Sequence, residues 1–199
     1  FSNYSSYDEC IPPGVLLPNI DISETQYKNI NCDPSVSNLE FLKNLCKHGA
    51  LEKGVNLSSS DYKKRLSYEL RILNKLGFID YILLNWDILN FCHENNIPTG
   101  PGRGSAAGSL VLFLINVTKV DPIKYDLFFE RFVSESRAKK TEHKGETYLD
   151  GSLLADIDND IAYEHRDRVI KYIEEKYPNK TAKILTLNTL TVSYTHLRA

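Results

Sequence analysis

The middle of the chain carries the stretch Thr99-Gly100-Pro101-Gly102-Arg103-Gly104-Ser105, around which the rest of the sequence must fold. Three glycines and a proline within seven residues cannot form a helix interior, because glycine is conformationally free and proline lacks a backbone donor. The stretch is therefore predicted to be a loop. Small residues and then a strongly apolar run follow at 106–115, which predicts a buried helix that begins where the loop ends.

A glycine-rich loop that ends at a helix N-terminus is suited to bind a phosphate. Glycines let the backbone approach an anion, free N–H groups at the helix start bind it, and Arg103 and Ser105 add donors. The loop is not a P-loop, because the Gly-Lys-Ser/Thr ending is missing, and Gly108 is out of place for the dinucleotide fingerprint. The spacing alone leaves open a simpler alternative, a glycine turn that only allows a helix to pack tightly.

Three helices are predicted upstream of this loop. The apolar residues within 39–50 lie on one helix face, and Gly49 is a plausible stop. Residues 59–61 offer N-caps for a second helix that runs to Gly77, and a third is expected at 81–95.

Downstream of the loop the pattern changes to short elements. The expected elements, in chain order, are an aromatic-rich turn at 125–132, a polar surface loop at 137–145, a hairpin around Asp150-Gly151, a strand at 156–161, a helix at 164–177 closed by Pro178, and a strand at 184–190. Residues 1–37 mix Ser, Asn, Asp and Pro with short apolar runs, which predicts an extended connector.

The expected strand at 156–161 carries the acidic pattern Asp156-x-Asp158-x-Asp160. The period of two in a strand places all three carboxylates on one face, with neighbours about 7 Å apart. Like charges gathered in this way repel unless a cation or solvent compensates, and hard divalent ions such as Mg²⁺ prefer oxygen ligands. The pattern therefore predicts a shared metal site, and a solvated acidic strand edge is the alternative.

An EF-hand calcium loop is a further alternative, because the three aspartates occupy its positions one, three and five. Two later positions argue against it. Ile161 stands where the sharp turn needs glycine, and Asp167 stands where a bidentate glutamate is expected.

The loop and the acidic pattern together carry more weight than either alone, since they lie about fifty residues apart in one chain. A nucleotidyl transferase needs one part that holds a triphosphate and another that holds metal ions. In two-metal chemistry one ion activates the attacking 3′-hydroxyl and the other stabilises the leaving pyrophosphate.

Composition sets limits on partners and compartment. The formal net charge is −2, so any contact with DNA must be local. The apolar run 78–91 is too short and too polar to span a bilayer, and no signal peptide is recognisable. Four isolated cysteines, Cys10, Cys32, Cys46 and Cys92, fit reduced thiols of a cytosolic protein better than a zinc site or a disulfide framework.

The run from Gly100 to Leu110 resembles the signature loop of the C-family bacterial replicases, the alpha subunits of DNA polymerase III. Its neighbours agree, and they include Gly77-Phe78, Asp121-Pro122 and Phe129-Glu130-Arg131-Phe132. The segment 156–160 is similar to the aspartate strand of the family, although Ala155 replaces the proline that usually precedes it. The resemblance covers roughly residues 39–191.

The resemblance implies roles for individual residues. Asp158 and Asp160 match the family's catalytic metal ligands, which hold two Mg²⁺ ions in the complete site, whereas Asp156 matches an aspartate not usually counted among them. Gly104 and Ser105 match residues that meet the phosphates of the incoming nucleotide, and Arg103 is a secondary candidate. Two further arginines, Arg131 and Arg137, are candidates for contact with DNA or triphosphate, with plain surface residues as the alternative. The histidines His48, His93, His143 and His165 have no partner at ligand spacing and fit ordinary surface residues.

The implied fold is an α/β, partial polymerase palm of the polymerase-beta-like nucleotidyltransferase type with flanking helices. The palm is expected at 38–191, and 1–37 is expected to be a linker or the tail of a preceding polymerase and histidinol phosphatase domain. Residues 192–199 break the family pattern and resemble a non-native tail, so His196 is assigned no function. The third catalytic carboxylate is expected beyond this chain, which predicts that the fragment alone is inactive.

The implied function is that of a DNA-directed DNA polymerase in the cytoplasm, which transfers a nucleotide from a deoxynucleoside triphosphate to a primer 3′ end. Expected partners are primer-template DNA and deoxynucleoside triphosphates, with no membrane. The sliding clamp, the proofreading exonuclease and the clamp loader are also expected, through parts mostly outside this chain. A non-catalytic nucleotide- or metal-binding module is the alternative function.

Overall fold

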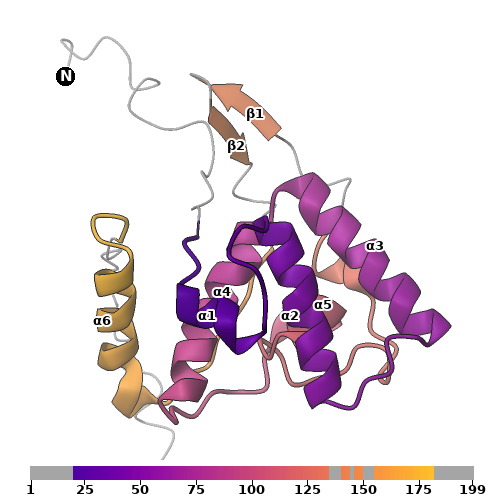
Figure 1. Cartoon of the computed structure of the whole chain (residues 1–199), viewed down its shortest axis with the longest axis horizontal. Coiled ribbons are helices and arrows are strands. Elements are labelled where there is room, and N and C mark those ends of the chain that lie inside the picture. Colours follow the sequence, from indigo (N-terminus) through magenta and orange to yellow (C-terminus); the bar gives the residue numbers. More distant parts are fainter. Residues whose placement is uncertain (1–19, 135–139, 144–145, 150–154, 182–199) are drawn as a thin grey trace, which may run out of the picture.

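The computed structural model describes residues 20–134, 140–143, 146–149 and 155–181 (Figure 1). The helices among these residues are α1 (Glu24–Asn29), α2 (Asn38–Glu52), α3 (Ser60–Leu76), α4 (Ile79–Glu94), α5 (Leu110–Leu114) and α6 (Arg166–Lys176). Single 3₁₀ turns are η1 (Gly104–Gly108), η2 (Phe129–Arg131) and η4 (Tyr163–His165). No helix in the described part of the chain is both long and apolar enough to cross a bilayer.

The hydrophobic core lies where α2, α3 and α4 surround the short helix α5. Helix α5 contacts both α2 and α3, and α6 packs against α4 on the side away from α3 (Figure 1). Many apolar side chains of these helices are fully buried, among them Phe41, Leu73 and Ile82. The run 110–114 is buried at nearly every position, which explains why its sequence is apolar without helical periodicity.

The three long helices confirm the predictions made for them, with one correction at Gly49. Helix α3 ends at Gly77, which adopts the left-handed conformation at φ +78°. Helix α2, however, continues through Gly49 to Glu52. A Cβ atom at Gly49 would stand 1.8 Å from the backbone oxygen of Leu114. This glycine therefore lets α2 approach α5 closely and does not end the helix.

We expect Gly49→Ala to destabilise the chain by about 3 kcal/mol, because α2 and α5 would have to separate to admit the methyl group. Urea unfolding followed by the fluorescence of Trp86, the one tryptophan of the chain, measures the change. Gly54→Ala is the matched control. Gly54 has φ +66° with open space around it, so only backbone strain of about 1 kcal/mol is expected there. Equal midpoints for the two variants would contradict the packing argument.

The expected connector differs from the structure in its second half. Ser23 accepts a hydrogen bond from the backbone of Gln26, whose side chain caps Ser23 in return, and this capping box starts helix α1. Tyr27 of this helix is buried, with its ring 5.0 Å from that of Phe41 in an edge-to-face contact. The polar composition of this segment did not reveal the short helix α1, whose Tyr27 packs on the core.

Residues 1–19 and 192–199 lie outside the described part, and the domain boundaries stay predictions.

The helix expected at 106–115 is divided in two. Turn η1 is followed by a break at Ser109, whose extended φ of −98° and ψ of 123° separate it from α5. The segment that carries Phe128 passes close to this break, since a Cβ at Gly108 would stand 2.6 Å from the Phe128 carbonyl oxygen. A single straight helix would not leave room for that segment.

Strands are fewer than the α/β prediction requires. The described residues hold one antiparallel sheet, in which β1 (Lys140–His143) pairs with β2 (Glu146–Leu149), so part of the expected surface loop at 137–145 is a strand. The expected hairpin around Asp150-Gly151 differs from this sheet, because β2, the strand before Asp150, pairs with β1, the strand that precedes it in the chain. Residues 150–154 and the strand expected at 184–190 lie outside the described residues. The described part is thus helix-rich and matches the α/β prediction only in part.

Candidate nucleotide-phosphate and metal site

The glycine loop and the acidic segment 155–161 lie against each other. The backbone N–H of Gly100 donates to the carbonyl oxygen of Asp160 at 2.9 Å, and Thr99 forms an isolated antiparallel bridge with Ile161. The acidic segment was predicted to be a strand, but this bridge is its one ladder contact among the described residues. Two stretches separated by about sixty residues of sequence thus meet at one place.

The glycines of the loop face the two aspartates assigned to metal. A Cβ atom at Gly100 would lie 2.7 Å from the Cβ of Asp160, and one at Gly104 would lie 3.9 Å from Oδ2 of Asp158. Gly104 has φ +65°, which favours glycine at this position. Ser105 follows with its Cα about 3.8 Å from that of Gly104, so it stands in the same neighbourhood as Asp158.

Arg103 points toward the acidic segment. Its Nε lies 2.9 Å from Oδ2 of Asp160, and the two side chains are 62% and 43% exposed. An ion pair this exposed contributes less than about 1 kcal/mol, so either partner can exchange it for another ion at little cost. The candidate phosphate-binding arginine therefore pairs, in this structure, with a candidate metal ligand.

The acidic segment keeps the alternation expected of a strand even though it lacks a ladder. Ile157 packs against the core, and the side chain of Asn159 is directed to helix α4. Asp156 and Asp158 are exposed and Asp160 is half-buried. Exposed and half-buried positions therefore alternate from Asp156 to Asn159 and no further, and contacts with α4 and the loop stand where a neighbouring strand was expected.

A cavity of about 840 Å³ opens beside the loop. Its lining includes Gly104 and Ser105 on one side and Phe128, Glu130 and Arg131 on the other. Arg131 therefore shares a cavity with the loop residues assigned to phosphate, while Arg137 lies outside the described residues.

A buried carboxylate that the sequence did not assign to the site binds the backbone just after the loop. Glu69 of α3 has no exposed surface and accepts hydrogen bonds from the backbone N–H groups of Leu110 and Val111 at 2.9 and 3.0 Å and from the Ser109 hydroxyl at 2.9 Å. Arg65 donates to it from one helical turn earlier at 2.6 Å. Burial raises the pKa of the Glu69 carboxyl, and these donors act in the opposite direction.

Arg65 extends the same network to the far wall of the cavity. Its Nη2 donates to the carbonyl oxygens of Gly108 and Leu127 at 2.7 and 2.8 Å. The pair Arg65–Glu69 therefore connects α3 to the end of η1, the start of α5 and the segment that carries Phe128. The spacing of four residues was visible in the sequence, but the burial that distinguishes this pair from a surface ion pair was not.

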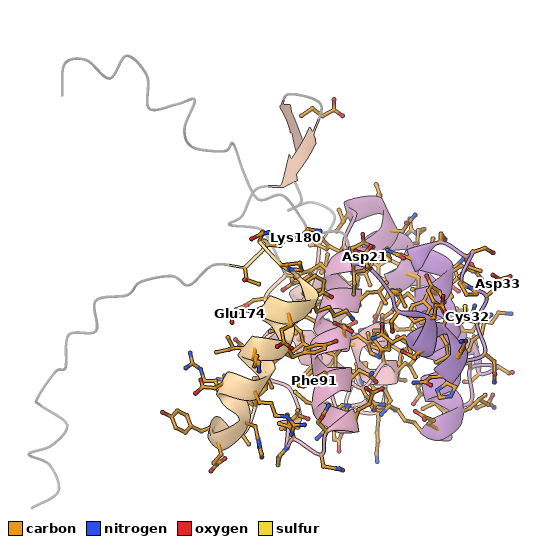
Figure 2. The ribbon with its side chains drawn as sticks, turned by 60° about the vertical axis from the view of Figure 1, so that its left-hand side comes forward. Asp21, Cys32, Asp33, Phe91, Glu174 and Lys180 are labelled. Atoms are coloured by element: carbon orange, nitrogen blue, oxygen red, sulfur yellow. The ribbon has the colours of Figure 1, made fainter. Side chains whose placement is uncertain are left out.

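A second buried carboxylate fastens α6, the helix that follows the acidic segment. Asp87 of α4 accepts hydrogen bonds from Gln26 at 2.6 Å, from Lys176 at 2.5 Å and from the hydroxyls of Tyr172 and Tyr177. Burial, together with the charge of Asp87, raises the pKa of both tyrosines, so they remain donors. Phe91 lies on the side of α4 that faces α6 (Figure 2), and its ring stacks on Tyr172 at 3.9 Å.

The described residues bring together no group of three or more histidine, cysteine, aspartate or glutamate side chains that could hold a metal ion. What they offer is the pair Asp158 and Asp160, two accessible carboxylates that both approach glycines of the loop. Accessible carboxylate oxygens suit a hard cation such as Mg²⁺, which usually keeps several waters and takes one or two protein carboxylates together with substrate phosphates. The residues present therefore fit a metal ion that further ligands complete.

Comparison with known proteins places this chain in a class. The family model for the bacterial DNA polymerase III alpha NTPase domain matches residues 40–195, so the chain is a polymerase-related domain. The chain is 41% identical over 152 residues to a DNA polymerase III subunit alpha of Halalkalibacterium halodurans, 43% over 161 residues to that of Ureaplasma parvum, and 36% over 173 residues to that of Bacillus subtilis.

These alignments cover 76%, 78% and 86% of the chain, respectively. The chain belongs to the bacterial DNA polymerase III alpha family, which confirms the resemblance seen in the sequence. It spans only 12% to 15% of the length of these three relatives.

Proposed function

We propose that the chain is part of a DNA-directed DNA polymerase that extends a primer 3′ end from deoxynucleoside triphosphates during DNA replication. The observation that carries the proposal is the approach of the glycine loop to the aspartates, with Gly104 facing Asp158 and Gly100 facing Asp160. A triphosphate on the loop would then lie within reach of metal ions held by the carboxylates.

The residues divide the work as follows. Backbone N–H groups at Gly104 and Ser105, with the Ser105 hydroxyl, hold phosphate oxygens of the nucleotide. Asp158 and Asp160 would hold Mg²⁺, which would supply activation of the 3′-hydroxyl and charge stabilisation at the leaving pyrophosphate. Arg103, which pairs with Asp160 here, would be available to a phosphate oxygen of the nucleotide if that carboxylate held a metal ion.

The cavity beside the loop is the place for the rest of the nucleotide. Arg131 lines it together with Ser105 and would supply a second cationic contact to the triphosphate or to DNA. Phe128, 63% exposed, offers an aromatic face to a base. Arg137 is proposed as a further DNA or triphosphate contact on its position in the sequence.

The site is incomplete within this chain. Two carboxylates form half of a two-metal site, and the third carboxylate of the family comes from a later part of the protein, in the proposed palm. We therefore expect the fragment alone to be inactive, since positioning and metal geometry supply most of the catalysis. The proposed partners of the parent enzyme are primer-template DNA and the clamp, proofreading and clamp-loader subunits, and the proposed compartment is the cytoplasm.

Primer extension by the full-length protein tests the proposal. We expect wild-type enzyme to extend a primer in Mg²⁺, and Ser105→Ala to raise the KM for deoxynucleoside triphosphate about tenfold, because one hydrogen bond to a charged group is lost. Ser67→Ala, which removes an exposed hydroxyl on α3 outside the site, should leave both KM and kcat unchanged.

The same experiment distinguishes the polymerase proposal from the alternative, a non-catalytic nucleotide- or metal-binding module. A non-catalytic module would bind deoxynucleoside triphosphate through Ser105 but would not extend the primer. Binding measured by calorimetry without any synthesis by the full-length protein would therefore reject the polymerase proposal in favour of that module.

A further inference from the structure

Helix α4 holds the acidic segment from the side opposite to the loop. The Tyr81 hydroxyl donates to the carbonyl oxygen of Ala155 at 2.9 Å. One turn further along the helix, Oδ1 of Asn85 accepts a hydrogen bond from Nδ2 of Asn159, also at 2.9 Å. Residues four apart lie on one helix face, so the two side chains form a single row along the segment. The row begins before the first aspartate and ends between the second and the third.

Asn85 can make this contact in only one way. It is 7% exposed, and its Nδ2 donates to the carbonyl oxygen of Tyr81 at 2.9 Å. That bond assigns the amide orientation, which leaves Oδ1 as the acceptor for Asn159. The partner Asn159 is itself half-buried between Asp158 and Asp160. A fixed amide on a long helix thus determines the position of the residue that separates the two candidate metal ligands.

We infer that Asn85 is a positioning residue for the metal site, because its hydrogen bond to Asn159 sets how Asp158 is oriented relative to Asp160. The inference rests on the proposed function. Two apolar side chains could fill the same space but would tolerate several registers, whereas a buried amide pair is satisfied in one register.

The geometry indicates what happens when this bond is lost. Asp160 is also fixed from the loop side, because its carbonyl oxygen accepts from the Gly100 N–H and its side chain pairs with Arg103. Asp158 faces Gly104, and among the described residues its side chain takes part in no hydrogen bond or ion pair of that kind. Loss of the Asn85 contact should therefore release Asp158 while Asp160 stays in place, and the distance between the two carboxylates would no longer be set.

Metal binding by the full-length enzyme tests the inference, with Mn²⁺ as the probe and electron paramagnetic resonance as the readout. We expect Asn85→Leu to weaken Mn²⁺ binding about tenfold, the range seen when a partner of a ligating residue is removed. In primer extension kcat should fall by a similar factor at low metal concentration and recover as Mn²⁺ is raised. The KM for deoxynucleoside triphosphate should change less than about twofold, because the phosphate loop is untouched.

A matched control comes from the same helix. Asn90 donates to Glu94 on α4 and does not contact the acidic segment, so Asn90→Leu makes the same chemical change away from the site. It should leave Mn²⁺ binding unchanged. A tenfold loss in this variant as well would show that any amide removed from α4 matters and would overturn the specific role of Asn85.

Asn159→Leu removes the same hydrogen bond from the partially exposed side, where folding depends less on the side chain. We expect it to weaken Mn²⁺ binding as Asn85→Leu does, and the double variant to add little to either. Mn²⁺ affinities within twofold of wild type in both single variants would overturn the inference while leaving the proposed function intact. If instead Asp158→Asn leaves Mn²⁺ binding and synthesis unchanged, the proposed function itself fails.

Discussion

Asp158→Asn and Asp160→Asn should each reduce primer extension by the full-length enzyme at least about 10³-fold. Either change replaces a charged side chain, proposed as a metal ligand, with a neutral amide of the same shape, and electrostatic stabilisation at a metal-assisted centre is usually the largest part of the rate enhancement. Single-turnover extension of a labelled primer at saturating nucleotide measures the loss directly. The effect should lie in kcat, because the loop proposed to bind the triphosphate is unchanged.

Asp156→Asn is the matched control for both variants. Asp156 belongs to the same segment and is exposed, yet none of the described loop contacts involves it. We expect synthesis within about threefold of wild type. An equal loss in all three variants would mean that the segment acts through its total charge, and the assignment of Asp158 and Asp160 as the ligands would be wrong.

Folding should not explain the losses. Asp158 is exposed, and Asp160 gives up only an exposed pair with Arg103, so the free energy of unfolding should change by less than about 1 kcal/mol. Thermal unfolding of each variant, compared with wild type, checks this. A variant that is inactive and also unfolds at a much lower temperature would not count as support.

The sequence predicted the features that depend on local pattern. Helix α3 was predicted from its N-cap serines and its terminal Gly77, and the loop at 99–105 from its glycines, because each signal is a conformational preference of the residues themselves. The alternation predicted for the acidic segment holds only from Asp156 to Asn159. These features needed no knowledge of which other part of the chain lies nearby.

The errors concern features that depend on distant partners. Gly49 was interpreted as a stop, although its role is set by Leu114, and the acidic segment was predicted as a strand, although its partners are α4 and the loop. Glu69 and Asp87 have the appearance of helix-surface charges in the sequence. Their burial depends on the packing of α5 and α6, which no local pattern encodes.

Glu69→Gln should destabilise the chain by about 3 kcal/mol or more, although the side chain keeps its size. Each carboxylate oxygen of Glu69 accepts two hydrogen bonds, Oε1 from Arg65 and Leu110 and Oε2 from Ser109 and Val111. A glutamine must direct its NH₂ group at one of these donor pairs whichever way it is turned, and Arg65 would also lose its countercharge. Urea unfolding followed by Trp86 fluorescence gives the difference.

Glu40→Gln is the comparison that isolates burial. Glu40 also pairs with a cation on its own helix, Lys43 at 3.0 Å, but its side chain is 44% exposed. Such a pair contributes less than about 1 kcal/mol, so this variant should unfold close to wild type. If the two variants were equally stable, the buried network would carry no special weight.

A double variant, Arg65→Met with Glu69→Leu, tests whether these two residues matter only as an ion pair or also as hydrogen-bond partners of the backbone. Replacing a buried ion pair with apolar side chains is often neutral, because the desolvation of both charges is relieved. Here Glu69 also accepts from two backbone N–H groups at the start of α5, and Arg65 donates to two backbone carbonyl oxygens. All four backbone groups would lose these partners, so we expect no rescue. Stability within about 1 kcal/mol of wild type would show that the pair matters only as two opposite charges, whereas a full loss would show that it holds the end of the loop to α3.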